Sequence, residues 1–251
     1  SAYPADPRRW RGHTDTFRRD EHSPYDWQSH AGQRWFMQAA KERGVEQVVA
    51  FVYSPPKWLT KNGNISPDPT VGRSNLAPED TGRFASYLAD IVQHFAEEGM
   101  PFHAISPVNE PSWSWDGKLQ EGNRYPNELI KELVKRLCGE LDRRGLETAV
   151  DIAEAAQIAT LMDDEDILAW DPNFDFQRAD ENGKYGGKYR EYVKEFLGDQ
   201  AFSEMIGHKL SYHAYWADQI GDADRLISYR RHLRRTLDRH APNAKLWQTE
   251  F

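Results

Sequence analysis

The sequence has little of several features that mark common protein classes. Its single cysteine, Cys138, cannot form an internal disulfide or a cysteine-based zinc site. No apolar run approaches the roughly 20 residues that a membrane-spanning helix needs, so we expect no membrane segment. The formal charge is −8, from 40 acidic against 32 basic side chains, which argues against non-specific nucleic-acid binding. No strand-like segment runs into a glycine-rich phosphate turn, which weakens a nucleotide-binding interpretation.

Aromatic side chains, by contrast, are abundant. The chain has nine tryptophans, eleven tyrosines and eleven phenylalanines in 251 residues. A core absorbs many of these rings, but tryptophan on a surface forms a platform for flat, weakly polar ligands such as sugar rings. The length suits one domain of (β/α)₈ size or at most two small ones.

Strand-like and helix-like segments alternate along the chain. Strands are expected at 48–53, 102–106, 148–153, 209–213 and 244–249, and helices at 33–43, 78–99, 129–145, 189–197 and 226–237. The first strand is a continuous apolar run and is expected to be buried on both faces. This alternation predicts an α/β fold with parallel strands and right-handed crossovers. An open doubly wound sheet and a (β/α)₈ barrel both fit it, and both place their chemistry at the carboxyl ends of the strands.

Two glutamates follow strand ends. Asn109 and Glu110 come shortly after the second expected strand, and Glu250 ends the fifth, so the two carboxyl groups are expected to converge. Glycoside hydrolysis uses such a pair, one to protonate the leaving oxygen and one to attack or to activate water. The competing interpretation is that Glu110 caps a helix and Glu250 is a surface charge. The acidic run 163–166 lacks EF-hand spacing and is interpreted as a solvated turn or a helix start.

Several segments together resemble one known family. They are YDW at 25–27 with GQRW at 32–35, SPPKWLTKNG at 54–63, ISPVNEP at 105–111, QEG at 120–122, HAYW at 213–216 and TEF at 249–251. These segments are similar to glycoside hydrolase family 30, a retaining family with a (β/α)₈ barrel. The Asn-Glu-Pro signature is shared across the wider clan, whereas the segment at 54–63 is much more specific. The resemblance covers essentially the whole chain.

The resemblance implies roles for individual residues. Glu110 resembles the general acid/base and Glu250 the nucleophile, while Asn109 would hold the 2-hydroxyl of the sugar. The remaining positions that the family pattern carries over are Trp58, as a wall of that subsite, and His213 and Tyr215, which would position the nucleophile and the sugar. No metal or organic cofactor is implied.

Four more side chains lie at or near strand ends and are candidate sugar contacts. They are Trp113, Trp115, Trp216 and Glu154. Each also has a structural interpretation. The tryptophans can serve as packing residues, with Trp113 and Trp115 facing different ways because they alternate, and Glu154 can make a structural hydrogen bond.

The strand count predicts an incomplete barrel over residues 1–251. In the family the acid/base ends strand four and the nucleophile ends strand seven, whereas here they end the second and fifth expected strands. Strands three to seven would then be present. Strands one and two would be missing before Ser1, strand eight after Phe251, and the family's β-sandwich would also be missing. Unpaired edges would leave the isolated chain unstable and poorly active.

The function implied is that of an O-glycosyl hydrolase: a retaining enzyme acting on β-linked polysaccharide or oligosaccharide. The β-1,6-galactanase-like members are the most similar. Xylanase and β-glucosidase or glucosylceramidase types are alternatives, as is an inactive carbohydrate-binding protein. The expected partner is a carbohydrate, with no nucleic acid and no membrane. No signal peptide is recognisable at Ser1, yet a polymeric substrate favours a secreted, periplasmic or cell-surface protein.

Overall fold

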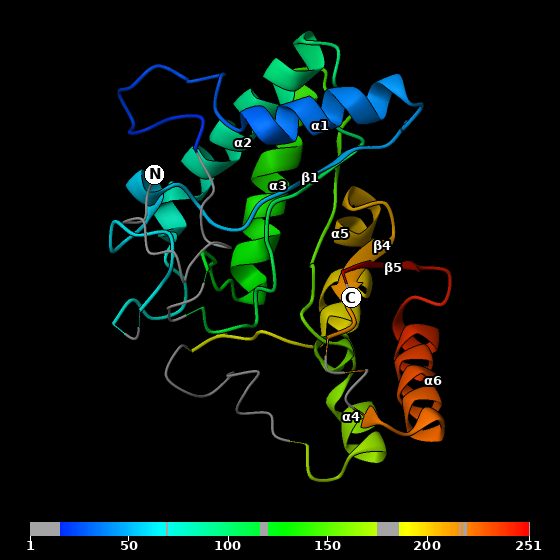
Figure 1. Cartoon of the computed structure of the whole chain (residues 1–251). Coiled ribbons are helices and arrows are strands. Elements are labelled where there is room, and N and C mark those ends of the chain that lie inside the picture. Colours follow the sequence, from blue (N-terminus) through cyan, green and yellow to red (C-terminus); the bar gives the residue numbers. More distant parts are fainter. Residues whose placement is uncertain are drawn as a thin grey trace.

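The computed structural model describes residues 16–68, 70–115, 120–174, 186–215, 217 and 220–250. Helices and parallel strands alternate along the chain, which confirms the predicted α/β class (Figure 1). The strands are β1 (Val49–Phe51), β2 (Ala104–Ser106), β3 (Ala149–Val150), β4 (Lys209–His213) and β5 (Lys245–Glu250). The helices are α1 (Ala31–Glu42), α2 (Thr81–Glu97), α3 (Asn127–Arg143), α4 (Asp164–Trp170), α5 (Gln200–Met205) and α6 (Ala223–His240), with a π-helical turn at Val193–Leu197.

The strands follow one another in chain order. β1, β2 and β3 form one sheet, β4 and β5 form a second, and every pairing between them is parallel. A parallel bridge between Ala155 and Tyr212 joins the two sheets just beyond the end of β3. The order therefore runs from β1 to β5 without a reversal, so the carboxyl ends of all these strands face the same side.

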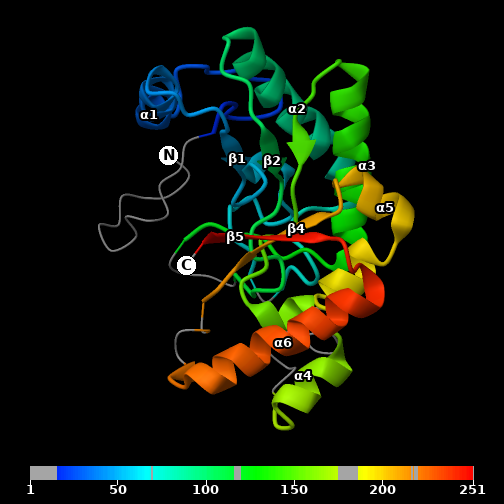
Figure 2. The same cartoon turned by 90° about the vertical axis from the view of Figure 1, so that its right-hand side faces the viewer.

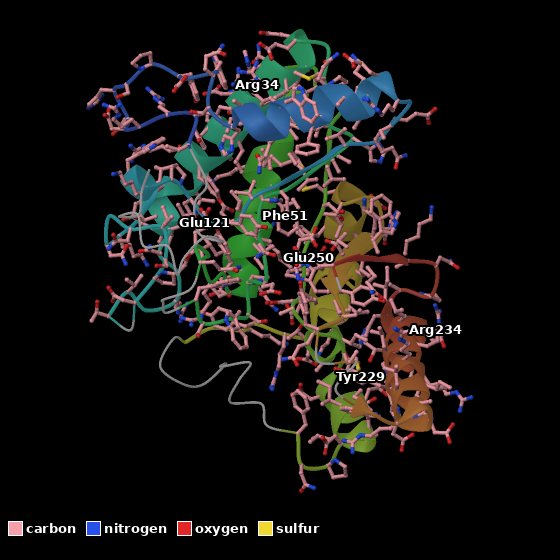
Figure 3. The ribbon with its side chains drawn as sticks, in the orientation of Figure 1. Arg34, Phe51, Glu121, Tyr229, Arg234 and Glu250 are labelled. Atoms are coloured by element: carbon pink, nitrogen blue, oxygen red, sulfur yellow. The ribbon has the colours of Figure 1, made fainter. Side chains whose placement is uncertain are left out.

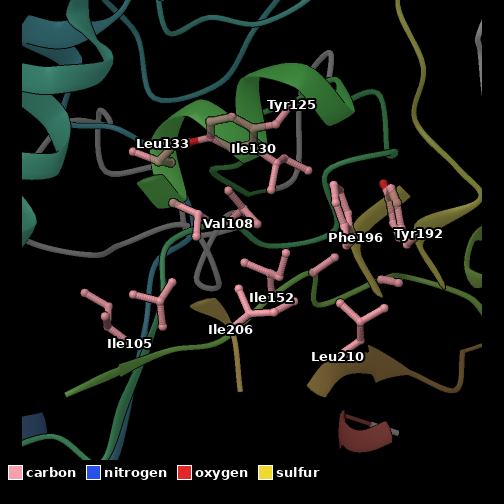
Figure 4. Close-up of a cluster of buried hydrophobic side chains, with 14 of the residues drawn as sticks. Ile105, Val108, Tyr125, Ile130, Leu133, Ile152, Tyr192, Phe196, Ile206 and Leu210 are labelled. Atoms are coloured by element: carbon pink, nitrogen blue, oxygen red, sulfur yellow. The ribbon is translucent and has the colours of Figure 1, made fainter. Parts of the chain in front are cut away.

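The core lies between the strands and the longer helices. α2 and α3 each bury one stripe of apolar side chains at helical spacing, while their opposite faces carry charged residues. Figure 4 shows the part of the core where the strands meet α3 and the π-helical turn. Its labelled members include Ile105, Ile130, Leu133, Ile152, Phe196 and Leu210. Burying each such side chain stabilises the fold by about 1.5–3 kcal/mol.

Helices lie at both ends of the molecule. α1 and α2 lie at one end and α4 and α6 at the other, with the strands between them (Figures 1 and 2). Asp163 and Asp166, at the start of α4, bind Arg239 of α6, and Thr236 donates a 2.6 Å hydrogen bond to Asp166. The acidic run at 163–166 is thus a helix start paired with a cation. No helix in the described ranges is long and apolar enough to span a membrane.

One expectation about the strands is wrong. The run at 48–53 was expected to be buried on both faces, but β1 is partly exposed and Val49 is 39% exposed. Among the described residues β1 pairs only with β2, and its side chains line a cavity rather than a packed core. An apolar strand can be buried on both faces, but it is buried only where neighbouring elements cover it.

Candidate active site

Glu110 and Glu154 occupy similar turns beyond neighbouring strands. Glu110 lies four residues after β2 and Glu154 four residues after β3, and both have left-handed backbones, with φ of 43° and 47°. The Glu110 N–H donates a 2.9 Å hydrogen bond to the Glu154 carbonyl. Left-handed backbone is uncommon for residues other than glycine, and such strain is concentrated at functional sites. These turns place both carboxyl groups at the carboxyl ends of the strands.

His213, the last residue of β4, connects the carboxylates. Its fully buried ring places Nδ1 2.8 Å from Glu110 Oε1 and Nε2 3.2 Å from Glu154 Oε2. Carboxylates accept hydrogen bonds, so an imidazole between two of them is best matched when both nitrogens carry a proton. Burial by itself lowers the pKa of His213, but the hydrogen bonds that the ring makes to Glu110 and Glu154, together with the charge of Glu250, outweigh it and raise the pKa to about 9. This shift favours the protonated, cationic form of the buried ring at neutral pH.

Glu250, at the end of β5, lies on the more open side of this cluster. Its Oε2 is 3.5 Å from His213 Nδ1 and accepts a 3.0 Å hydrogen bond from the Tyr215 hydroxyl. An oxygen of Glu250 lies within 4.8 Å of one of Glu110. The neighbouring Thr249 hydroxyl donates to Glu154. The two glutamates expected to converge thus lie side by side, with one histidine between them.

A cavity of about 1140 Å³ opens beside the carboxylates. Glu250, Glu121, Tyr53 and Ser54 are among its polar lining residues. Apolar residues of β1, α1 and α2 and further polar side chains, including those of Gln33 and Arg34, line the rest. Figure 3 labels Phe51, Glu121 and Glu250, which all border it. Burial and the charges of the surrounding glutamates raise the pKa of Tyr53. The volume is sufficient for a small-molecule or oligosaccharide ligand.

Asn109 is buried beside the cluster. It is 2% exposed, and its Oδ1 has no hydrogen-bond partner among the described residues. A buried acceptor without a partner is expected where a ligand or water completes the hydrogen bond. The role expected for Asn109, binding a sugar hydroxyl, stays a prediction.

The tryptophans separate into different environments. Trp113 is 38% exposed, whereas Trp115 is 7% exposed and donates from Nε1 to the Glu110 carbonyl at 3.1 Å. Trp58 is half-buried, donates to the Arg18 carbonyl and packs edge-on against Tyr87. Trp58 does not line the cavity described above, and its expected role as a subsite wall stays a prediction. Trp216 lies outside the described residues.

Sequence reasoning missed other residues of the cavity as site residues. Tyr53 and Ser54 follow β1, so their place at a strand end was a usable signal. Glu121 lies far along the loop that connects β2 to α3, well beyond the strand end, so the strand-end pattern does not indicate it. The signal in the sequence for Glu121 is the segment QEG at 120–122, which resembles the family.

Glu110, His213 and Glu250 also have the spacing of a metal site, because their ligand atoms lie within 4.8 Å of one another. A metal needs a lone pair on the imidazole, and His213 shares its nitrogens with two carboxylates that favour the protonated ring. The chemistry of the cluster therefore favours protons over a metal ion, and a metal-free site stays our prediction.

Comparison with known proteins places these residues in a family. Over 132 residues the chain is 33% identical to an endo-β-1,6-galactanase of Hypocrea rufa, covering 51% of this chain and 27% of that protein. Over 112 residues it is 30% identical to an exo-β-1,6-galactobiohydrolase of Bifidobacterium longum subsp. longum, covering 41% of this chain and 7% of that protein. The matched regions are thus a minor part of both relatives.

A solved structure has a similar fold over nearly the whole chain. The crystal structure of a conserved exported protein from Bacteroides fragilis matches with a TM-score of 0.79 and 25% identity, covering 96% of this chain and 46% of that one. Residues 6–251 match the O-Glycosyl hydrolase family 30. With the paired carboxylates at the strand ends, this match shows that the chain belongs to O-glycosyl hydrolase family 30.

Proposed function

We propose that the chain carries the active site of a retaining β-glycosidase, with Glu110 as general acid/base and Glu250 as nucleophile. The observation that carries the proposal is the separation of the two carboxylates, which have oxygens within 4.8 Å of each other. Retaining enzymes hold the two groups about 5–5.5 Å apart, whereas inverting enzymes need about 6.5–9.5 Å to admit a water molecule.

The reaction proceeds in two steps. Glu250 attacks the anomeric carbon while Glu110 gives its proton to the leaving oxygen, so a glycosyl ester forms as the glycosidic bond breaks. Glu110 then takes a proton from water, which attacks the ester and releases Glu250. Ester formation removes the charge of Glu250 and prepares Glu110 to act as a base.

The substrate proposed is a β-linked galactan, and β-1,6-galactan in particular. Both curated relatives are named for action on β-1,6-linked galactose, which supports this choice over xylan or β-glucosides. Export is proposed as well, because a polymer is met outside the cell and one similar structure is described as an exported protein.

A (β/α)₈ barrel is the fold proposed for the strands. The order from β1 to β5 without a reversal supports it, because an open doubly wound sheet reverses its strand order at its switch point. In this proposal residues 1–251 form one catalytic unit, and the strands are the third to the seventh of the barrel.

Substitution of the two glutamates tests the function. We expect Glu250→Gln and Glu110→Gln to lower kcat on β-1,6-galactan by at least about 10²- to 10⁴-fold, because each removes a group that forms or breaks a bond. With 4-nitrophenyl β-galactoside, whose phenolate leaves without a general acid, azide should restore turnover to Glu110→Ala and give a β-glycosyl azide, since azide attacks the ester without a general base. The control is Glu147→Gln, because Glu147 is exposed and is distant in the sequence from both Glu110 and Glu250. Unchanged turnover in both Gln variants would favour a different hydrolase mechanism, and binding of galactan without turnover by the parent would favour a carbohydrate-binding protein.

A further inference from the structure

Glu121 is a buried carboxyl group that the two-step reaction does not use. It is 7% exposed, and its Oε2 accepts a 2.7 Å hydrogen bond from the Ser54 hydroxyl. Its other oxygen, Oε1, is buried and has no hydrogen-bond partner among the described residues. An unsatisfied buried acceptor is unfavourable, and more so when it is charged. Such an oxygen is expected where a ligand supplies the missing hydrogen bond.

Glu121 belongs to the same cavity as the proposed nucleophile. It approaches from the segment before α3, whereas Glu250 approaches from β5 (Figure 3). Tyr53 lies close enough to both glutamates to be affected by their charges. Burial and then the charges of Glu250, Glu121 and Glu110 raise the pKa of Tyr53. Glu121 therefore borders the same cavity as Glu250, without belonging to the His213 cluster.

The protonation of Glu121 suits a hydroxyl ligand. Burial raises its pKa to about 7, although the Ser54 hydrogen bond opposes the shift. The ionised form accepts hydrogen bonds only, and the neutral form can also donate one. A sugar hydroxyl both donates and accepts, so it satisfies Oε1 in either form. A cationic ligand would be matched by the ionised form alone.

We propose that Glu121 and Ser54 form a hydroxyl-binding pair that recognises one hydroxyl of the substrate sugar, away from the bond that is cleaved, and so determines which sugar is accepted. The proposal rests on the glycosidase function proposed above. One hydroxyl is specified because Ser54 already donates to Oε2, whereas Oε1 has no partner among the described residues. Ser54 donates its own proton to Glu121, so its oxygen remains an acceptor for the same sugar.

A purely structural role makes a different prediction. The Glu121–Ser54 hydrogen bond also ties the segment before α3 to the end of β1. If that were its only role, loss of Glu121 would loosen the cavity and weaken turnover of every sugar to the same extent. A recognition role instead makes the loss depend on one particular hydroxyl.

The experiment combines side-chain substitutions in the intact protein with substrates that each lack one hydroxyl. The substrates are 4-nitrophenyl β-galactoside with its 3-, 4- and 6-deoxy analogues, and the matching β-glucoside and β-xyloside. The variants are Glu121→Ala and Ser54→Ala, with Glu132→Gln, an exposed residue of α3 paired with Arg136, as the control. We expect one deoxy analogue to lose about 10- to 100-fold in kcat/KM with the parent, the effect of a hydrogen bond to a charged group.

The decisive result concerns the same analogue with the variants. Glu121→Ala should lower kcat/KM on the parent sugar by a similar factor and then show little further loss with that analogue. An equal loss on every sugar would overturn the proposal and leave Glu121 a structural residue. If Glu121→Ala does not fold, Glu121→Gln replaces it. This variant keeps the side-chain size but no longer titrates, so any pH dependence of sugar selectivity near pH 7 should disappear, and its persistence would overturn the proposal.

The two proposals fail in different ways. Full turnover by Glu110→Gln and Glu250→Gln would remove the glycosidase mechanism, and the hydroxyl-binding pair with it. Loss of turnover in those variants together with uniform behaviour of Glu121→Ala would remove the hydroxyl-binding pair alone.

Discussion

The site has a buried side and an open side, and the two hold their carboxylates differently. On the buried side the side chains of Glu154 and His213 are fully buried and that of Glu110 is 12% exposed. On the open side the Glu250 side chain is 32% exposed, and its partner Tyr215 is 40% exposed. Burial strengthens charge interactions, whereas water screens them. The buried side therefore fixes the geometry, and the open side is where a substrate can reach a carboxylate.

The largest expected difference between the two sides is in stability. Glu154→Ala should lower the free energy of unfolding by about 3–5 kcal/mol, because it removes one partner of a buried ion pair and leaves His213 uncompensated on that side. Glu250→Ala should change it by no more than about 1 kcal/mol, as is usual for a half-exposed charge. Urea unfolding of both variants beside the parent measures the difference. Equal losses would mean that the two sides do not differ as described.

The pH dependence of stability is the next effect. The pKa of His213 is raised from its ordinary value of 6.5 to about 9, so its stabilising contribution is complete below about pH 6.5. That contribution is lost as the pH rises through about 9. It amounts to at most about 3 kcal/mol.

Unfolding curves at pH 6, 8 and 10 test this dependence. The parent should lose stability over that range, and His213→Gln should lose less. NMR titration of the ring reports its pKa directly. A midpoint near or below 6.5 would contradict the description of His213 as a buried cation.

A smaller effect is expected on the open side. Tyr215→Phe removes the 3.0 Å hydrogen bond to Glu250 and should lower kcat/KM by about 10-fold, with little change in stability. The matched control is Tyr212→Phe, because Tyr212 lies three residues earlier and makes only a 3.5 Å contact with Gln248. Similar losses in both variants would show that Tyr215 does not act through Glu250.

The positions of the strands in the sequence could be predicted better than the contacts between the strands and their neighbours. β4 is expected at 209–213 and is found there, directly after a glycine-containing turn that marks its start. Burial of β1 was predicted wrongly, since it depends on a second neighbouring strand and not on the run itself. α5 was not anticipated, because a helix of one to two turns carries too little periodicity to be recognised.

The same distinction holds within the site. Glu110, Glu250 and His213 lie at or just beyond ends of parallel strands, so topology alone brings them together. Glu121 reaches the cavity from far along the loop between β2 and α3, and Trp58 packs against Tyr87 although it lies near the end of β1. Such positions depend on loop conformation and on contacts between distant segments, for which a single sequence carries no periodic signal.

The stereochemistry of the first product tests the central claim most directly. Hydrolysis of a β-1,6-linked galacto-oligosaccharide by the intact protein can be followed by proton NMR before the product mutarotates. Carboxylate oxygens within 4.8 Å of each other predict that the β-anomer appears first and the α-anomer only later. Initial release of the α-anomer would contradict attack by Glu250 and the two-step mechanism.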